Sequence, residues 1–502
     1  MSRRKGLLLV LAALLSAGGY LWGAWARGAS GFPLDDAWIH QVYARNLGTR
    51  GEFAFFEGQP SAGSTSPLWT LLLSFGYWLN HDFRVWTYLL GITLFAASAL
   101  ITARLVTLPG YGSCVVRLAE RSFIIPLFLL FEWHLAWSAA SGMEILLFIF
   151  LSLLLLERFY ARERGWILGV LTGFLTLTRP EGLVLAALVG MGLLGQTSEP
   201  QRHEEGQEKK SDSRRTMGVW AVQFGGGIGL VLTPYLLFNL ATSSTLFPNT
   251  FYAKSAEYAE LFARTPFIVR WLELLGVPFV GAQILLVPGL IYGVIVRARG
   301  REWRALIPFA WILMLPALYA FHLPVAYQHG RYEMPIIPFI VMYGIEGTAA
   351  LWMRVRNFVL RATWTLATAA TLVAFWVIGA VQYSADVAII DCEMVQTARW
   401  VAANAPADTV VAAHDIGALG YFYERPFIDL AGLVSPEVIP FLRDEDRLRD
   451  YLFSRRATFV VVFPEWYPAF DADRRFVPAY QTTCAVTRAA GERNMIVYRI
   501  VR

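Results

Sequence analysis

Eleven apolar stretches constrain this chain more than any other feature of its sequence. A helix that spans a bilayer needs about 20 mostly apolar residues. The expected spans are 6–26, 84–106, 122–138, 143–157, 165–178, 181–195, 218–240, 272–296, 305–321, 333–352 and 361–383. The composition agrees, because 56% of the residues are apolar and 16% are charged, against about 45–50% and about 25% in soluble domains. The sequence therefore predicts a polytopic α-helical membrane protein and excludes disordered, collagen-like, disulfide-scaffold and coiled-coil classes.

Basic residues gather in alternate loops, and this predicts the orientation of the spans. Lys and Arg are enriched on the cytoplasmic side of membrane proteins. With eleven spans and a cytoplasmic N-terminus, every basic group falls on that side, namely residues 3–5, 158–164, 202–215, 297–304 and 354–361. This parity requires that the short apolar stretch 67–80 does not cross, so we interpret it as a juxtamembrane or re-entrant helix. The net charge of +5 follows from the same bias, and nothing indicates a nucleic-acid partner.

The first span is expected to stay in the protein as an anchor. Trp22, Trp25 and Arg27 stand behind it, where a cleaved signal peptide would carry small residues. The anchor is part of a membrane domain, residues 1–383, whose first external loop covers 28–83.

Residues 384–502 are expected to form a small external α/β domain. A helix is predicted over 392–403, strands over 409–413, 427–430 and 458–463, and a hairpin over 476–501 with its turn at 490–492. The chain has three cysteines, and of these only Cys392 and Cys484 could lie on the same side of the membrane. At most one disulfide is therefore expected.

An acidic pair opens the helix predicted in the first external loop. Asp35 and Asp36 precede apolar residues at helical spacing, Ile39, Val42 and Tyr43. An aspartate at this place can cap the helix, but adjacent side chains on a helix point in different directions. We therefore expect one carboxylate to cap the helix and the other to face a cavity.

Further ionisable residues are predicted at the external ends of the later spans. Glu144, Arg179 and Glu181 lie at two hairpin mouths, where ionisable groups are paired or functional, and a structural Arg179–Glu181 pair is one reading. Together, the external cations form a surface that suits a phosphate-bearing ligand, although any one of them can be an interface anchor. These cations are Lys254, His322, His329 and Arg331. No tight ligand spacing demands a metal, and a divalent cation such as Mg²⁺ or Mn²⁺ is left open.

Several short motifs occur in an order that resembles a known superfamily. They are Asp35-Asp36-Ala37-Trp38-Ile39, Tyr43-Ala44-Arg45-Asn46, Thr65-Ser66-Pro67-Leu68-Trp69, Ser141-Gly142-Met143-Glu144, Arg179-Pro180-Glu181 and Pro248-Asn249-Thr250-x-Tyr252-x-Lys254. This order and the external C-terminal domain resemble the GT-C membrane glycosyltransferases. More narrowly, the motifs are similar to the bacterial branch that contains the terminal arabinofuranosyltransferases of cell-wall arabinan.

The resemblance implies a sugar donor linked to polyprenyl phosphate and transfer on the external face of a bacterial plasma membrane to a glycan, lipid or protein acceptor. Asp35 or Asp36 would be the general base. Positive charge must stabilise the departing phosphate, and the candidates are Lys254, Arg331, Arg179 and His329. Supporting positions are Trp38, Arg45, Asn46, Thr65, Glu144, Glu181, Asn249 and Tyr252. No metal ligand is assigned.

Two other functions are weighed against transfer. A transporter or flippase for lipid-linked sugars would carry charges and broken helices near the membrane midplane, whereas the middles of five predicted spans hold no Asp, Glu, Lys or Arg. They are 8–24, 88–101, 220–232, 282–295 and 365–380. A non-catalytic envelope assembly protein would not need the acidic pair and Lys254.

Overall fold

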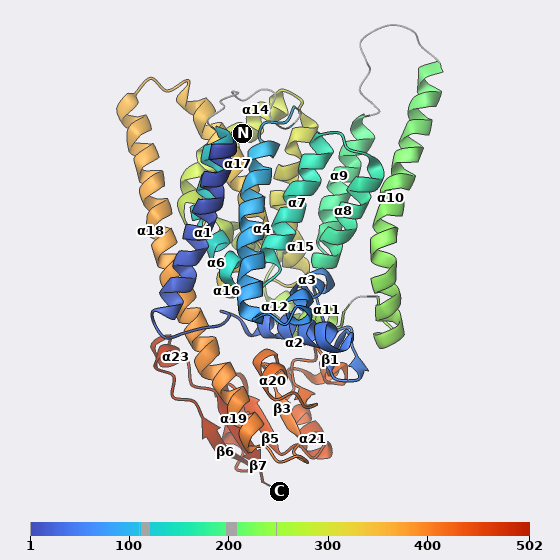
Figure 1. The fold of residues 1–502 in the computed structure, drawn as a ribbon, viewed down its shortest axis with the longest axis vertical. Helices are drawn as coiled ribbons and strands as arrows, with labels where there is room; N and C mark the ends of the chain where they lie inside the picture. The colour runs from blue at the N-terminus through green and yellow to red at the C-terminus, as the bar shows by residue number, and fades with distance from the viewer. Residues whose placement is uncertain (1, 110, 112–120, 197–207, 247, 502) are drawn as a thin grey trace.

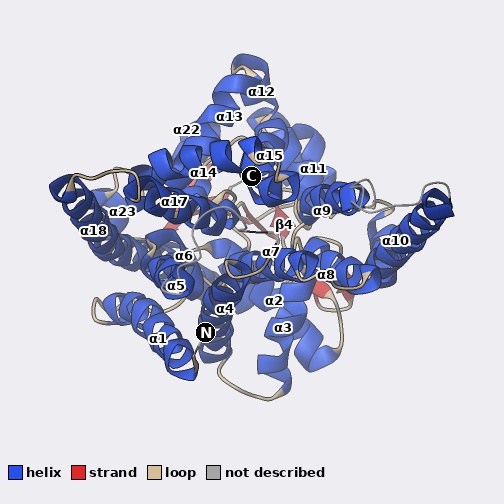
Figure 2. Ribbon diagram, turned by 90° about the horizontal axis from the view of Figure 1, so that it is seen from above, coloured by secondary structure: helices blue, strands red, loops and turns tan. Residues whose placement is uncertain are grey.

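The computed structural model of this chain has a layer of long helices above a smaller domain that contains a sheet (Figure 1). It describes all residues except 1, 110, 112–120, 197–207, 247 and 502. The helical layer consists of α1 (Arg3–Trp25), α4 (Phe83–Leu105), α5 (Arg121–Phe131), α6 (Trp133–Ala140), α7 (Ile145–Tyr160), α8 (Gly165–Thr178), α9 (Gly182–Gln196), α10 (Glu208–Ser243), α14 (Val287–Arg299), α15 (Ile307–His322), α17 (Ile337–Trp352) and α18 (Phe358–Ile390). Seen from above, α7 lies near the centre, and α10 and α18 lie at the rim (Figure 2).

The described residues include seven helices that are long and apolar enough to cross a membrane, or eight if the bent pair α5–α6 is one span. The three other predicted spans coincide with the shorter helices α7, α8 and α9. The chain is a multi-pass membrane protein, and the number of eleven crossings stays a prediction. Of the basic cytoplasmic loop predicted at 196–217, residues 197–207 lie outside the described residues, and residues 208–217 are helical and begin α10 instead of forming a loop.

Two spans that were predicted as single helices are broken. The stretch 122–138 bends by 64° between α5 and α6, and at the break Glu132 caps α6 by accepting the Leu135 N–H at 2.9 Å. The stretch 272–296 is divided into α13 (Phe267–Gly276), two 3₁₀ turns and α14, with Pro278 and the positive φ of Gly281 at the break. Both predictions of a continuous helix were wrong, because an apolar pattern persists across such breaks.

The first external loop forms a separate tier between the helical layer and the C-terminal domain. It contains α2 (Asp35–Arg50), α3 (Pro67–Trp78), and the short strands β1 (Ala54–Phe56) and β2 (Gln59–Pro60). Helix α3 lies beside α2 (Figure 1), and its 12 residues are fewer than a membrane span needs. The two helices approach so closely that a Cβ atom on Gly48 would lie 2.6 Å from the Ser74 carbonyl oxygen. Helix α11 (Asn249–Glu257) and α12 (Ala259–Arg264) belong to the same tier.

The C-terminal domain is α/β, as predicted. Its sheet has the order β4-β3-β5-β7-β6, in which β3 is parallel to β4 and β5, and β7 is antiparallel to β5 and β6. The strands are β3 (Val411–Ala413), β4 (Ile428–Asp429), β5 (Phe459–Val462), β6 (Phe476–Gln481) and β7 (Ile496–Ile500). The predicted hairpin is β6–β7, with α23 (Ala485–Ala489) in its connection. Helices α20 (Gly417–Phe422), α21 (Glu445–Ser454) and α22 (Pro468–Ala472) were not predicted.

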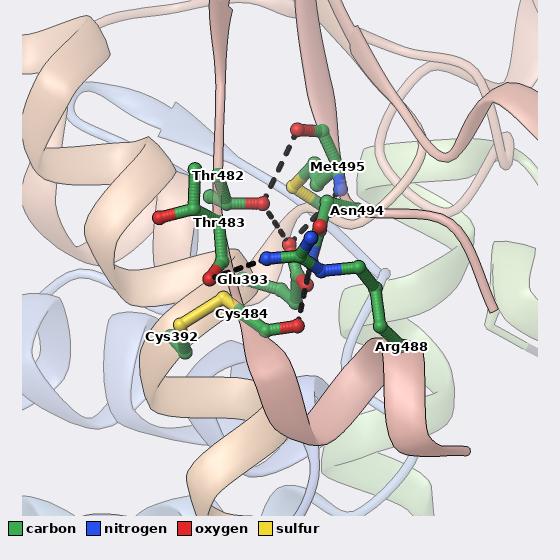
Figure 3. The surroundings of a disulfide bond; sticks show 8 residues. All are labelled: Cys392, Glu393, Thr482, Thr483, Cys484, Arg488, Asn494 and Met495. Atoms are coloured by element: carbon green, nitrogen blue, oxygen red, sulfur yellow. Dashed lines mark hydrogen bonds between the residues drawn. A yellow bond between two sulfur atoms is a disulfide. The ribbon is translucent and has the colours of Figure 1, made fainter. Parts of the chain in front are cut away.

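One long helix joins the two layers. Helix α18 passes the predicted boundary at residue 383 without a break and continues through a π-helical turn, Asp391–Val395, into α19 (Gln396–Asn404). A disulfide between Cys392 and Cys484, the one pairing that the sequence analysis left open, ties this helix to the β6–β7 connection (Figure 3). Beside it, the buried Glu393 accepts hydrogen bonds from the Asn494 amide at 2.7 Å and the Met495 N–H at 2.9 Å. Covalent and polar contacts thus fix the domain on the helix.

Candidate active site

A cavity of about 100 Å³ lies between α2, α11 and the ends of the helical layer that face them. Seven of the predicted site residues line it, and they come from α2, the loop before α3, the α7, α8 and α9 ends, α11 and the segment before α17. These residues are Asp36, Thr65, Glu144, Arg179, Glu181, Lys254 and Arg331. His322 also lines the cavity, together with His40, Tyr319 and Tyr332, which the sequence analysis did not single out.

Asp36 directs its carboxylate into this cavity, where 39% of the side chain is exposed. The Arg331 guanidinium donates to its Oδ2 at 2.5 Å. Burial by itself would raise the pKa of Asp36, but the charges of Arg331 and Lys254 outweigh burial and lower that pKa to about 2. The carboxylate is therefore ionised and held by cations.

Tyr332 lies at the centre of the cations. Its phenolic oxygen accepts hydrogen bonds from Lys254 Nζ at 2.8 Å and from Arg331 Nη2 at 2.9 Å. Its ring lies 4.9 Å from the Arg331 guanidinium, 5.3 Å from that of Arg179 and 5.4 Å from Lys254 Nζ, within the range of cation–π attraction. Arg331 is 3% exposed, and its Nε and Nη1 make no hydrogen bond to the described residues. Concentrated positive charge with spare donors favours an anion.

The cavity lining contains a second ion pair. Arg179 Nε donates to Glu144 at 2.7 Å, and His40 Nε2 lies 3.2 Å from the same carboxylate. Glu181 instead accepts the Tyr319 hydroxyl at 2.7 Å. The Arg179–Glu181 pair considered from the sequence is therefore wrong, because the hairpin mouths bring Glu144 and Arg179 together across two different helices.

Asp35 does not cap its helix. Leu34 occupies the cap position, and no side chain caps the first turn. The Asp35 carboxylate points to the C-terminal domain and accepts the N–H groups of Gly417 at 2.6 Å and Ala418 at 2.8 Å. Burial raises the pKa of Asp35 to about 6. The expected division of the acidic pair is half right: one carboxylate faces the cavity, but the other binds another domain.

His329 does not line the cavity, so the structure does not bring it together with the other predicted phosphate ligands. It bonds Asp386 of α18 at 2.8 Å and packs edge-on against Trp133 and Trp137, each 5.4 Å away. Only Gly330 separates it from Arg331 in the sequence, but the chain turns between them. The positive φ angles of Gln328, His329 and Gly330 produce this change of direction.

The remaining supporting residues hold the first external loop or lie outside the cavity lining. Trp38 packs on Tyr421 and Phe422, and Arg45 donates to the Tyr421 carbonyl at 2.7 Å. Asn46 donates to the carbonyls of Ala54 and Phe55. Tyr252 is 39% exposed and does not line the cavity. Asn249 begins α11, and its side chain lies outside the described part of the structure.

The arrangement of the His, Cys, Asp and Glu side chains also bears on metal binding. Among the described side chains, no group of three or more His, Cys, Asp or Glu converges in a way that could hold a metal ion. The cavity carboxylates are engaged by Arg331, Arg179, His40 and Tyr319 instead.

Several solved structures share this fold. The apo structure of ArnT from Cupriavidus metallidurans superimposes with a TM-score of 0.60 and 12% identity over 99% of this chain and 98% of that chain. ArnT bound to undecaprenyl phosphate gives a TM-score of 0.60 and 13% identity over 98% and 97%. The Archaeoglobus fulgidus oligosaccharyltransferase AglB, in complex with an inhibitory peptide and a dolichol-phosphate, gives 0.60 and 12% over 92% and 70%.

Sequence comparisons add one match. Residues 392–498, most of the C-terminal domain, match a family described as a domain of unknown function (DUF8728). No protein with a curated description matches the sequence. ArnT and AglB are GT-C glycosyltransferases, and the resemblance predicted from the short motifs is confirmed at the level of the fold. This chain is a multi-pass α-helical membrane protein with the GT-C fold and a small C-terminal α/β domain.

Proposed function

We propose that this protein is a glycosyltransferase that moves a sugar from a polyprenyl-phosphate donor to a hydroxyl group of a glycan, lipid or protein acceptor. One observation carries the proposal. The Asp36 carboxylate lies in the same cavity as the cations Arg331 and Lys254, which surround Tyr332. The neighbours with the same fold support it, because ArnT binds undecaprenyl phosphate and AglB is in complex with a dolichol-phosphate. The cavity belongs to the tier that we assign to the external face of a bacterial plasma membrane.

The proposed reaction needs one base and one cationic site. The acceptor oxygen forms a bond to the anomeric carbon, while the bond from that carbon to the phosphate oxygen breaks and its electron pair stays on the phosphate. Asp36 takes the proton of the acceptor hydroxyl. Arg331 and Lys254 stabilise the charge that develops on the departing lipid phosphate. Arg179, which also lines the cavity and lies 5.3 Å from the Tyr332 ring, adds positive potential. Phosphate leaves readily without a general acid, and this scheme assigns no step to a metal.

The contact between Asp36 and Arg331 also predicts an order of binding. A carboxylate whose pKa is about 2 is a weak base. A donor phosphate would share the cations Arg331 and Lys254 and reduce their effect on Asp36, so the pKa of Asp36 would rise. The base then becomes effective after the donor has bound, and the donor binds before the acceptor.

Complementation of a deletion strain tests the proposal. Without this protein, mass spectrometry should find that one envelope glycan or glycoconjugate has lost a sugar and that a lipid-linked sugar has accumulated. The native gene should restore the glycan, whereas Asp36→Asn should not. Asp408→Asn, which alters an exposed carboxylate of the C-terminal domain, is the matched control and should restore it. Full restoration by Asp36→Asn would refute the proposed base.

Transport of a lipid-linked sugar is the second candidate, because one feature favours it. Glu132 is fully buried at the 64° bend between α5 and α6, where it bonds His134 at 2.6 Å and Gln283 at 2.6 Å. Broken helices with polar groups at depth are typical of transporters. A transporter would move a fluorescent polyprenyl phosphate across proteoliposomes without sugar transfer, and the Asp36→Asn variant would move it equally well.

A further inference from the structure

The C-terminal domain holds the helix that carries Asp36. Its short helix α20 presents the N–H groups of Gly417 and Ala418 to the Asp35 carboxylate, at 2.6 Å and 2.8 Å. Gly417 has no room for a side chain, because a Cβ atom would collide with the Asp35 carbonyl oxygen and lie 2.9 Å from its Oδ2. This backbone approach is possible only for glycine.

The contacts between the C-terminal domain and α2 continue along that helix. Three residues after Asp35, the Trp38 ring packs between Tyr421 at 5.1 Å and Phe422 at 5.2 Å. Near the other end of the helix, Arg45 donates to the Tyr421 carbonyl at 2.7 Å and to Glu424 at 2.8 Å. The C-terminal domain therefore contacts α2 from Asp35 at its start to Arg45 in its second half, while the Asp36 carboxylate lines the cavity.

A second segment of the same domain forms part of the cavity wall. Asp429 accepts the N–H groups of Ala431 and Val434, both at 2.8 Å, and so fixes the loop between them. Leu433 of this loop lines the cavity. The loop packs so closely on the first external loop that a Cβ atom on Gly63 would lie 3.0 Å from the Leu433 carbonyl oxygen.

The domain is also fixed in its orientation. Helix α18 enters it as one continuous helix through α19, and the Cys392–Cys484 disulfide ties this helix to the β6–β7 connection (Figure 3). Glu393 lies beside the disulfide, is fully buried and also bonds that connection. The N–H groups of Gly417 and Ala418 that bind Asp35 therefore belong to a domain whose orientation is fixed by the continuous helix, the disulfide and the Glu393 hydrogen bonds.

We propose that the C-terminal domain is a working part of the active site: through Gly417 and Ala418 it holds Asp35, and so it sets the position of Asp36 in the cavity. This inference rests on the proposed transferase function and gives a role to a domain whose family is described only as having unknown function. Asp35 is then a positioning residue, and it does not touch the reacting groups.

The test compares two alanine variants of the full-length protein in nanodiscs. Gly417→Ala disturbs the contact with Asp35. Gly420→Ala is the matched control, because Gly420 lies in the same helix as Gly417 and in the same interface. Its Cβ atom would collide with the Phe55 ring, but it would not contact Asp35. Thermal unfolding and the intact disulfide check the fold. Binding of undecaprenyl phosphate is measured separately from transfer. Transfer is read as the polyprenyl phosphate released from lipid-linked sugars of the deletion strain when an extract that contains the acceptor is present.

We expect Gly417→Ala to lower the rate of sugar transfer without a comparable loss of lipid-phosphate binding. Gly417→Ala should lower the transfer rate about 100-fold, as expected for a misplaced base, with undecaprenyl phosphate affinity within about threefold of native. Gly420→Ala should keep most of the rate. Asp35→Asn, which retains one acceptor oxygen, should lose about tenfold. A folded Gly417→Ala protein with the native rate, or an equal loss in Gly420→Ala, would overturn the inference.

A second readout does not depend on transfer. If the native protein releases no polyprenyl phosphate, the proposed function fails, and hydrogen exchange in α2 then decides the positional claim. Faster exchange of residues 35–50 in Gly417→Ala than in Gly420→Ala supports the claim, and equal exchange in the two variants contradicts it.

Discussion

The Arg331 guanidinium donates to Asp36 Oδ2 at 2.5 Å although 295 residues separate the two in the sequence. The contact joins the first external loop to the segment before α17, and it makes one cavity out of two distant parts of the chain. It also sets the resting state of the proposed base, because a carboxylate held by a buried cation is a poor proton acceptor until that cation finds another anion.

Tyr332→Phe should weaken donor binding without unfolding the protein. The hydroxyl oxygen accepts hydrogen bonds from both Lys254 and Arg331, so its loss leaves two cations less well placed. A hydrogen bond to a charged group contributes about 1.5–3 kcal/mol, which corresponds to a loss of affinity of roughly 10-fold to 150-fold. Titration of undecaprenyl phosphate into nanodiscs measures it. Tyr327→Phe, in the same segment, is the control, and equal affinity in both variants would contradict the prediction.

His329→Gln should leave undecaprenyl phosphate binding close to native. The imidazole is engaged with Asp386 and two tryptophans, away from the cavity. The variant should instead lower the melting temperature, because Asp386 loses a partner in a partly buried site. A marked loss of donor affinity, with the melting temperature unchanged, would restore His329 to the phosphate site.

The stability of the native protein should depend on pH through Asp35. Burial raises the pKa of this carboxyl from 3.8 to about 6, so the folded protein holds the proton more tightly than the unfolded chain. Its contribution to stability is complete below about pH 4 and is lost as the pH rises through about 6. Asp35→Asn removes this titration.

Melting temperatures measured from pH 4 to pH 7 check the prediction. The difference in melting temperature between the native protein and Asp35→Asn should change across this interval in favour of the variant as the pH rises. Asp408→Asn, an exposed carboxylate, should run parallel to the native protein. A constant difference between the native and Asp35→Asn curves would show that Asp35 does not titrate in this range.

Removal of the disulfide should destabilise the C-terminal domain. The bond closes a loop of 92 residues, and its loss in a folded domain costs about 2–5 kcal/mol. The double variant Cys392→Ser and Cys484→Ser should melt at a lower temperature than the native protein, and reductant should have no further effect on it. Equal melting temperatures for the native protein with and without reductant would contradict this.

Much of the site could be predicted because charged residues are rare in the loops that are predicted to be external. Asp36, Lys254 and Arg331 were singled out one by one, and the structure brings them together. Tyr332 was missed although it is adjacent to Arg331, because an aromatic residue at a membrane interface has an ordinary role as an anchor. Its function as the acceptor between two cations depends on tertiary contacts.

Other features depend on contacts that no local pattern encodes. The partner of Asp35 is Gly417, 382 residues away in the sequence, whereas a first-turn aspartate ordinarily caps its own helix. The break at Glu132 could have been suspected from a charge in an apolar stretch, but the bend itself depends on bonds to His134 and Gln283. The spans and the sheet domain were predictable because hydropathy and strand alternation are local.

The measurement that tests the central claim most directly is the release of polyprenyl phosphate by purified protein. Lipid-linked sugars extracted from the deletion strain are incubated with native protein, with Asp36→Asn and with Asp408→Asn in the presence of an extract that contains the acceptor, and mass spectrometry quantifies the freed lipid phosphate. The account predicts release by the native protein and by Asp408→Asn, and none by Asp36→Asn, although all three bind undecaprenyl phosphate. Equal release by Asp36→Asn would contradict it.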